Sequence, residues 1–194
     1  MIAREYGKFI SEFVCHPKAV GAVAPSSQQL ARHLMRSIDW GATTTLVEYG
    51  PGTGAITRAI VSQLQPEMKF LAIEINPCFA EILQDRFPEA RVCKGSVEQV
   101  KEHCERHDID SVDVILSGLP WASFSAPRQT AYLNATMQVL RPGGQFITFG
   151  YLQGLLLPAG RRFRKKLRDY FGEVRVSKPV WANLPPAFFY CCRR

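Results

Sequence analysis

The chain has 194 residues, with 24 lysines and arginines against 17 aspartates and glutamates, and 46% of the residues are apolar. This length suits one domain, and the composition excludes disordered, collagen-like and coiled-coil chains. No apolar run approaches the roughly 18 residues that a membrane-spanning helix needs.

The positive charge is concentrated near the carboxyl end. Residues 1–154 hold 14 basic and 15 acidic side chains, whereas residues 155–194 hold 10 basic and 2 acidic ones. Such an asymmetry indicates an anionic partner, either nucleic acid or an acidic membrane surface. A solvated basic face is the alternative interpretation.

The N-terminus and the cysteines predict a cytoplasmic location. Glu5 and Glu12 interrupt the stretch that a secretory signal would need to be apolar. The six cysteines fit neither a zinc spacing nor a disulfide framework. We therefore expect the reducing cytoplasm, with thiols as small core residues.

Two short helices are expected first, over residues 2–14 and about 27–38. From residue 43 onward, strands alternate with helices. The expected strands are 43–50, 69–75, 90–96, 111–120 and 145–152. The expected helices are 54–64, 77–87, 97–107, 127–140 and 161–171, with a turn at 141–144 and a closing antiparallel pair at 173–181 and 186–192.

This alternation predicts a doubly wound α/β fold, with a mostly parallel sheet covered on both faces and an antiparallel closing part. Ligands of such sheets lie outside the carboxyl ends of the strands. The loops that matter therefore follow Glu48, Glu74, Lys94 and Ser117.

A glycine-rich turn follows the first of these strands. Gly50, Gly52 and Gly54 stand at a strand-to-helix junction, where glycines allow a tight turn and a close ligand approach. Glu74 ends the next strand, 22 residues beyond Gly52. A carboxylate at that position can accept both ribose hydroxyls of a nucleoside ligand.

The segments VEYGPGTGAIT and LAIEINP resemble the first two motifs of class I S-adenosylmethionine-dependent methyltransferases. The resemblance covers about residues 44–151 and implies a Rossmann-like fold with S-adenosylmethionine as cofactor. It places the glycines at the methionine moiety, Glu74 at the ribose, and Gly95, Ser96 and Val97 at the adenine. The expected cofactor-binding residues are Glu48, Tyr49, Gly50, Pro51, Gly52, Thr53, Gly54, Glu74, Ile75, Asn76, Gly95, Ser96, Val97 and Ser117.

The fourth strand ends in Gly118-Leu119-Pro120-Trp121. Ribosomal RNA adenine dimethylases carry Asn-(Leu/Ile)-Pro-(Tyr/Phe) here, so Gly118 takes the place of the amide that would hold an adenine amine. The resemblance implies that the Gly118 and Leu119 carbonyls orient the acceptor amine. Trp121 suits a cationic group through cation–π contact, or is a core residue in a rigid turn.

Tyr6 and His16 are candidate general bases, although a lone residue of either type is more often structural. His103 and His107 are interpreted as surface residues, and no metal site is expected.

The whole chain also resembles the short bacterial phospholipid N-methyltransferases that act on phosphatidylethanolamine. The resemblance rests on FISEFVCHPKAVGAVAPSSQQLA, GLPW and VWANLPPAFFY. It implies one domain over 1–194, with a helical cap at 1–40, a cofactor-binding core at 44–151 and a membrane-facing part at 152–194. The expected location is the inner face of the membrane, with an anionic membrane surface and a lipid substrate as partners and no obligate protein partner.

The membrane-facing part combines apolar and basic residues, which together can anchor a protein to anionic lipid. Alternatively, the leucines extend the fifth strand into the core. The candidate membrane-binding residues are Leu155, Leu156, Leu157, Arg161, Arg162, Arg164, Lys165 and Lys166.

Three functions remain open. The first is a lipid-headgroup N-methyltransferase that acts on phosphatidylethanolamine or on another aminolipid such as ornithine lipid. The second is an rRNA or DNA adenine N6-methyltransferase, which the basic carboxyl end would serve equally well. The third is a non-catalytic nucleotide-binding or adaptor protein, which the glycine turn and Glu74 make the weakest of the three.

Overall fold

Seven strands form one mixed sheet in the order β3-β2-β1-β4-β5-β7-β6. The computed structural model of the protein describes residues 28–183 and 185–194. The first five strands run parallel, and β7 lies antiparallel between β5 and β6. The strands are β1 Thr45–Tyr49, β2 Lys69–Glu74, β3 Arg91–Lys94, β4 Val112–Ser117, β5 Leu140–Tyr151, β6 Glu173–Val176 and β7 Ala187–Arg193.

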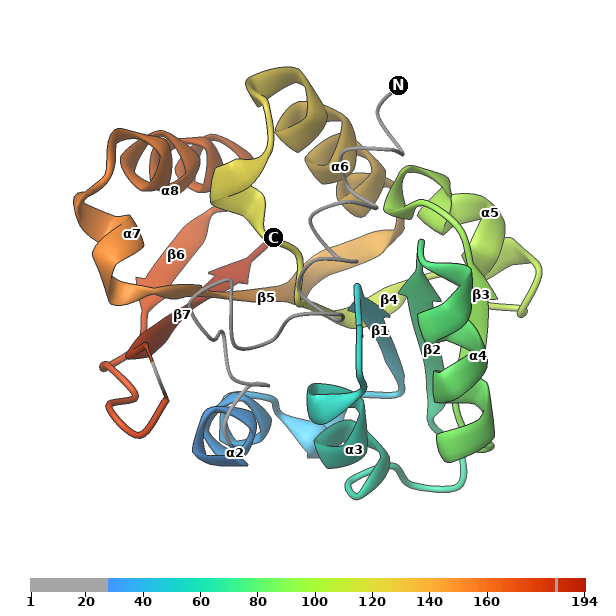
Figure 1. The fold of residues 1–194 in the computed structure, drawn as a ribbon. Helices are drawn as coiled ribbons and strands as arrows, with labels where there is room; N and C mark the ends of the chain where they lie inside the picture. The colour runs from blue at the N-terminus through green and yellow to red at the C-terminus, as the bar shows by residue number, and fades with distance from the viewer. Residues whose placement is uncertain (1–27, 184) are drawn as a thin grey trace.

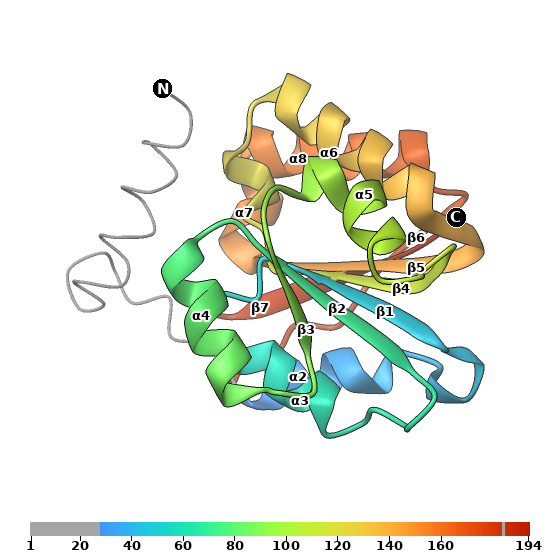
Figure 2. The same ribbon diagram turned by 90° about the vertical axis from the view of Figure 1, so that its right-hand side faces the viewer.

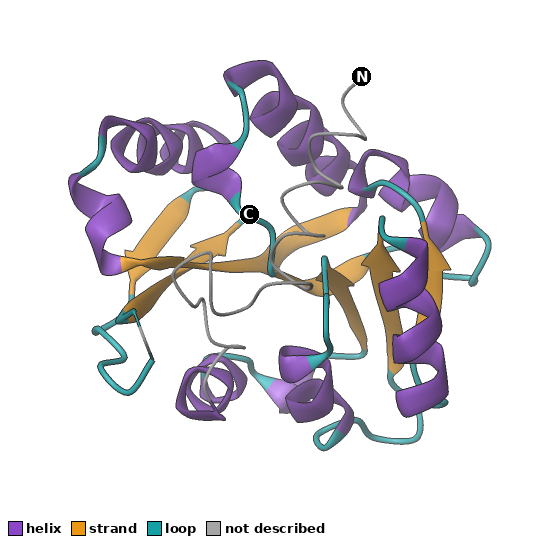
Figure 3. Ribbon diagram, viewed as in Figure 1, coloured by secondary structure: helices purple, strands orange, loops and turns teal. Residues whose placement is uncertain are grey.

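Helices cover both faces of the sheet, as the sequence predicts (Figures 1 and 3). One face packs against α5 Val100–Glu105, α6 Ala126–Val139 and α8 Pro158–Tyr170. The other packs against α2 Gln28–Arg36, α3 Ala55–Val61 and α4 Pro77–Arg86. Figure 2 shows the two helical layers with the sheet between them. The remaining helical segments are α7 Leu152–Leu156 and the 3-10 turns η1 Trp40–Ala42, η2 Val97–Gln99 and η3 Trp121–Ser123.

Strand β1 illustrates why the sheet is apolar throughout. All five of its residues are buried, because both faces of the strand are covered. Val47 and Tyr49 pack into the cluster under α5, α6 and α8, whereas Leu46 packs toward α2 and α3. Alternate side chains of β1 thus point into the two cores, because successive residues of a strand face opposite sides of the sheet.

Two expectations about local structure are wrong. Residues 141–144 are not a turn but an irregular part of β5, because Val112 pairs with Leu140 whereas Val114 pairs with Gln145. Gly143 has a φ of 74° there and donates its N–H to the Arg194 carbonyl, so β7 holds this bulge in place. The alternative in which the leucine run extends the fifth strand is also wrong, because β5 ends at Tyr151 and the short helix α7 follows it.

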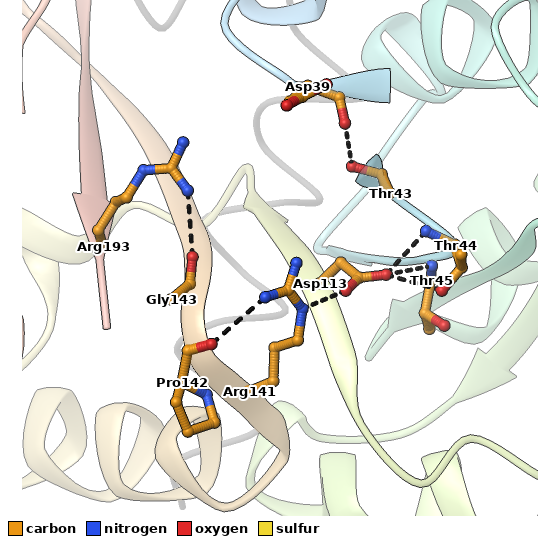
Figure 4. Close-up of polar contacts among 9 residues, drawn as sticks. All are labelled: Asp39, Thr43, Thr44, Thr45, Asp113, Arg141, Pro142, Gly143 and Arg193. Carbon is orange, nitrogen blue, oxygen red and sulfur yellow. Dashed lines mark hydrogen bonds and ion pairs between the residues drawn. The ribbon is translucent and has the colours of Figure 1, made fainter. Parts of the chain in front are cut away.

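A polar network joins the amino ends of three parallel strands (Figure 4). Asp113 accepts hydrogen bonds from the backbone N–H groups of Thr44 and Thr45 at 2.7 and 2.9 Å. The Thr44 hydroxyl also donates to it, and Arg141 forms an ion pair with its other oxygen. Asp113 therefore joins the beginnings of β1, β4 and β5. The carboxyl ends of these strands, at the other side of the sheet, border a cavity.

The first expected helix, Tyr6 and His16 lie outside the described residues. The second expected helix is confirmed as α2. The expected helix over 97–107 divides into η2 and the shorter α5.

Candidate active site

A cavity of about 520 Å³ opens at the carboxyl ends of β1, β4 and β5. Its polar end holds Glu48, Glu74 and the loop that contains Gly52. Its apolar end is lined mainly by residues of β5, α8 and β7, among them Phe149, Phe163 and Tyr190. The site thus lies where ligands of open α/β sheets bind.

The glycine turn contains three residues with positive φ, namely 64° at Gly50, 56° at Gly52 and 79° at Gly54. A Cβ at Gly52 would meet no atom within 4 Å, so this glycine faces open space. A Cβ at Gly54 would lie 2.6 Å from the Phe87 ring, and one at Gly50 would lie 2.7 Å from the Leu119 side chain. Only Gly52 therefore leaves open space for a ligand, whereas Gly54 lets α3 approach α4.

Glu74 is oriented by the turn across from it. One carboxylate oxygen accepts the Gly52 N–H at 3.0 Å, and the other accepts the Asn76 N–H at 2.9 Å. Burial raises the pKa of Glu74, and these backbone bonds oppose the rise. The carboxylate lines the cavity with lone pairs left over, so it fits the ribose hydroxyls of S-adenosylmethionine.

Glu48 lies deeper in the same end of the cavity. It accepts a hydrogen bond from the Thr57 hydroxyl at 2.7 Å. Burial raises the pKa of Glu48 to about 8, the Thr57 bond opposes this rise, and the charge of Glu74 adds to it. Two carboxyl groups in one cavity favour a cationic ligand, such as the ammonium group of the cofactor.

A recess of about 20 Å³ adjoins Glu74 and is bordered by Gly95, Ser96 and Val97, the residues that the sequence resemblance places at the adenine. Tyr132 of α6 also lines it. Tyr132 is not among the residues expected from the sequence, because a tyrosine on an amphipathic helix looks like an ordinary core residue. Ile75, exposed at the rim, borders the same recess.

Three expected cofactor residues do not face the cavity. Tyr49 is fully buried and its hydroxyl lies 3.4 Å from that of Thr136. Ser117 is also buried, and its hydroxyl accepts the Trp121 indole N–H at 2.9 Å. Asn76 instead caps α4 by accepting the Cys78 N–H at 2.9 Å. These residues support the walls of the site, whereas Pro51 and Thr53 do line it.

Gly118 is constrained by the neighbouring turn. Its N–H donates to the Tyr49 carbonyl at 2.8 Å, and a Cβ at this position would lie 2.7 Å from the Gly50 carbonyl oxygen. An asparagine would therefore force the glycine turn to move. The Leu119 carbonyl already accepts the Trp121 N–H at 2.9 Å, which leaves it one lone pair for an acceptor. Pro120 lines the cavity beside them.

Trp121 is part of an aromatic cluster and is only 3% exposed. Its ring stacks on Phe163 with a centroid distance of 5.2 Å and an interplanar angle of 15°. Phe124, Tyr132 and Phe146 meet it edge to face. Trp121 lines the cavity but has one ring face covered, so the structure favours the packing role over an open cation–π platform.

The interpretation of His103 as a surface residue is wrong, and His107 is partly exposed. His103 is buried beneath Gly95, where a Cβ on the glycine would lie 2.8 Å from its Nε2 atom. His107 is half-buried, with its Nε2 atom 3.3 Å from the Cys93 sulfur. His103 belongs to α5, whereas His107 lies just beyond its end and contacts Cys93 of β3. Among the described residues, no cluster of three or more His, Cys, Asp or Glu side chains fits a metal ion.

The candidate membrane-binding residues divide into two groups. Leu157 is 54% exposed at the rim of the cavity, and Arg161, Arg162 and Lys165 are also exposed. Leu155 packs on the core, and the Lys166 ammonium donates to the Ala126 carbonyl and the Thr130 hydroxyl of α6. Arg164 is half-buried. The side chain of Leu156 lies outside the described part of the structure.

Comparison with known proteins accounts for this arrangement. Residues 46–144 match the model of a methyltransferase domain family. An ornithine lipid N-methyltransferase from Singulisphaera acidiphila is 32% identical over 98% of this chain and 96% of its own length. This relative is a lipid enzyme, so the likeness to rRNA adenine dimethylases stays a resemblance of one motif.

Solved methyltransferases share the fold. An O-methyltransferase from Bacillus cereus, solved with SAH, gives a TM-score of 0.70 at 14% identity over 96% of this chain and 91% of its own. The O-methyltransferase TomG from Streptomyces achromogenes, solved with SAM, gives 0.67 at 17% identity over 95% and 88%. Together with the matched family model and the full-length relative, they show that the chain belongs to the methyltransferase domain family and is an S-adenosylmethionine-dependent methyltransferase.

Proposed function

We propose that the protein methylates the amine of an aminolipid headgroup, with an ornithine-type lipid as the best-supported acceptor. The observation that carries this proposal is the similarity to the ornithine lipid enzyme over almost the full length of both chains. It favours an ornithine-type acceptor over phosphatidylethanolamine, which the sequence resemblance alone had put first. The apolar end of the cavity supports a lipid acceptor, because it extends well beyond the cofactor residues.

Methyl transfer needs an unprotonated acceptor nitrogen in line with the methyl group that S-adenosylmethionine supplies when bound. An alkyl ammonium group has a pKa near ~10, so the site must remove a proton. The walls around Gly118, Phe163 and Tyr190 are largely apolar, which desolvates the amine and lowers its pKa. The free lone pair of the Leu119 carbonyl can then orient the neutral N–H, and positioning supplies most of the rate.

Gly118 argues against adenine as the acceptor. An adenine amine needs a side-chain acceptor and a stacking ring, but this glycine has no amide and the Trp121 ring is stacked on Phe163. The Gly50 carbonyl also occupies the space that an asparagine would need. We therefore place the adenine N6-methyltransferase second.

We also propose that the protein acts at a membrane surface. Among the described residues, no helix is long and apolar enough to cross a membrane. Leu157 and Trp181 are exposed large apolar residues, with Trp181 at 73%. Val180 is buried and pairs with Ala187, which in turn pairs with Tyr151 at the carboxyl end of β5. Trp181 is thus exposed to solvent near the carboxyl end of β5, the end of the sheet where the cavity opens. Exposed tryptophans at such a position are typical interfacial anchors.

The direct test uses labelled S-adenosylmethionine with three acceptors. Ornithine lipid and phosphatidylethanolamine are each presented in neutral detergent micelles, and RNA is assayed in a parallel tube. We expect label in ornithine lipid above the other two. Label in RNA alone would overturn the lipid proposal, and label in phosphatidylethanolamine alone would replace the ornithine headgroup.

A further inference from the structure

Arg164 lies on the inner face of α8. Gly160 and Phe163 of this helix line the cavity, and Arg164 stands one turn beyond Gly160 and next to Phe163. Residues four apart share a face of an α-helix, so Arg164 lies on the same face of α8 as Gly160, beside the residues that line the cavity. Arg161, Arg162 and Lys165 on the same helix are exposed instead.

The charge of Arg164 has no partner within the described part of the chain. Its Nε atom is buried and the N–H has no hydrogen-bond partner, and no hydrogen bond or ion pair joins the guanidinium to another described residue. Lys166, two residues further along, shows the usual solution, because its ammonium is held by two oxygens of α6. A buried donor of a charged group costs free energy when it is left unpaired, which indicates that something else completes it.

Tyr190 of β7 is the neighbour that connects Arg164 to the cavity. The tyrosine is buried, lines the apolar end of the cavity and packs edge to face against Phe163 at 6.2 Å. Burial raises the pKa of Tyr190, and the positive charge of Arg164 opposes this rise. Arg164 directly follows Phe163, the residue that contacts Tyr190, and both the phenol and the guanidinium can donate hydrogen bonds to an anion.

We propose that Arg164 and Tyr190 bind the anionic oxygen group of the acceptor headgroup, at the end of the cavity opposite to Glu48 and Glu74. This inference rests on the proposed function, because it assigns a subsite within the same cavity. An arginine suits the task because its fork matches a carboxylate or a phosphate.

The arrangement also orients the headgroup. An N-acylated ornithine keeps one free amine and one carboxylate, so it carries opposite charges at its two ends. Arg164 attracts the carboxylate and repels the ammonium end, whereas the carboxyl groups of Glu48 and Glu74 lie at the other end, on β1 and β2. The amine is thereby directed toward the cofactor, which makes Arg164 and Tyr190 positioning residues.

The test compares N-acyl ornithine lipid with its methyl ester, which keeps the amine and removes the negative charge. Both are presented to the wild-type protein in neutral detergent micelles, which minimises surface-charge effects. We expect kcat/KM to fall by about tenfold or more for the ester, in line with the loss of a charged hydrogen bond. Because this comparison needs no variant, it does not depend on whether a substitution disturbs folding.

The variant Arg164→Gln should lose this preference for the acid over the ester, with an unchanged Kd for S-adenosylmethionine. Arg58→Gln, an exposed arginine on α3, is the matched control and should keep the preference. A merely structural Arg164 would lower activity on both lipids equally and keep their ratio, which would overturn the inference.

Phosphatidylethanolamine in the same micelles identifies the source of the anion. Activity on it that depends on Arg164, with none on ornithine lipid, would support the subsite with a phosphate as its ligand. Equal wild-type activity on the acid and the ester would overturn the subsite while the proposed function stands. No methylation of any lipid would overturn both.

Discussion

The Gly52 N–H donates to the Glu74 carboxylate at 3.0 Å, so the turn after β1 and the end of β2 are joined directly. A backbone donor from the glycine turn thus holds Glu74, the acid that we propose as the ligand of the cofactor ribose. The same bond fixes the turn in its positive-φ conformation beside open space at Gly52. The two motifs act as one unit, and a change in either should affect cofactor binding.

We expect Glu74→Ala to weaken S-adenosylmethionine binding by about 1–3 kcal/mol, because the ribose hydroxyls lose a charged acceptor. Gly52→Val should abolish binding, since its side chain enters the open space and valine tolerates positive φ poorly. Isothermal titration calorimetry measures both. Glu81→Ala, at an exposed position on α4, is the control and should bind as the wild type does. Full affinity in Glu74→Ala would remove this carboxylate from the cofactor site.

Trp121→Ala should lower the free energy of unfolding by about 3–5 kcal/mol, as expected for a large buried aromatic. The indole ring stacks on Phe163 and its N–H donates a hydrogen bond to the Ser117 hydroxyl. Its loss therefore leaves a void between β4 and α8. Trp121→Phe should cost less, because it keeps a ring on Phe163. Urea unfolding measures the stability, and methyl transfer is assayed in parallel. Unchanged stability with strongly reduced turnover would instead restore Trp121 as an acceptor-facing residue.

The cofactor half of the site could be predicted from the sequence because local rules fix it. A glycine turn after a strand and an acid at the end of the next strand need no knowledge of distant contacts. Ser117 and Trp121 were assigned to ligands because sequence does not show that their polar groups satisfy each other across one turn. The role of Asn76 as a helix cap does have a local signal, because an asparagine directly before Pro77 at the start of a helix is a typical N-cap.

The acceptor half depends on contacts between distant segments. Phe163 and Tyr190 meet at the cavity only because α8 crosses over β7, and no spacing in the sequence encodes that crossing. The basic helix could be predicted from the sequence. The sequence does not distinguish the basic side chains on its packed face from those on its exposed face. Packing alone separates the half-buried Arg164 from the exposed Arg161.

Asp113 should make stability depend on pH in the acidic range. Burial raises the pKa of Asp113, but the bonds from Arg141, Thr44 and Thr45 outweigh it and hold the pKa below its usual value. A carboxyl whose pKa is depressed by folding contributes stability above its unfolded pKa, and this contribution is lost as the pH falls through the folded pKa. We therefore expect stability to decline below about pH 4, near the unfolded pKa of aspartate.

Asp113→Asn should remove part of that decline and lower the free energy of unfolding at neutral pH by about 1–3 kcal/mol, because the donors lose a charged acceptor. The exposed Asp110→Asn is the control and should change neither quantity. Urea unfolding at a series of pH values provides both measurements. An Asp113→Asn profile parallel to that of the wild type would show that other carboxyl groups cause the acid transition.

The last prediction concerns the exposed side of α8 and the rim of the cavity. Changing Arg161, Arg162 and Lys165 to Glu should strongly reduce binding to anionic vesicles, since each basic residue near such a surface contributes about 1 kcal/mol. Cofactor affinity should stay unchanged, because these side chains are exposed and do not line the cavity. Binding by the wild type should also weaken with salt, as screened surface charges do. Vesicle co-sedimentation at low and high salt provides the measurement.

The same change in charge elsewhere separates local docking from net charge. Arg32, Arg36 and Arg58 are exposed on α2 and α3, across the sheet from α8, and their change to Glu should reduce binding much less. Trp181→Ser should weaken binding at every salt concentration, because an apolar anchor does not depend on charge. If both triple variants lose binding equally and Trp181→Ser loses none, the attraction is a property of net charge and α8 is not the docking face.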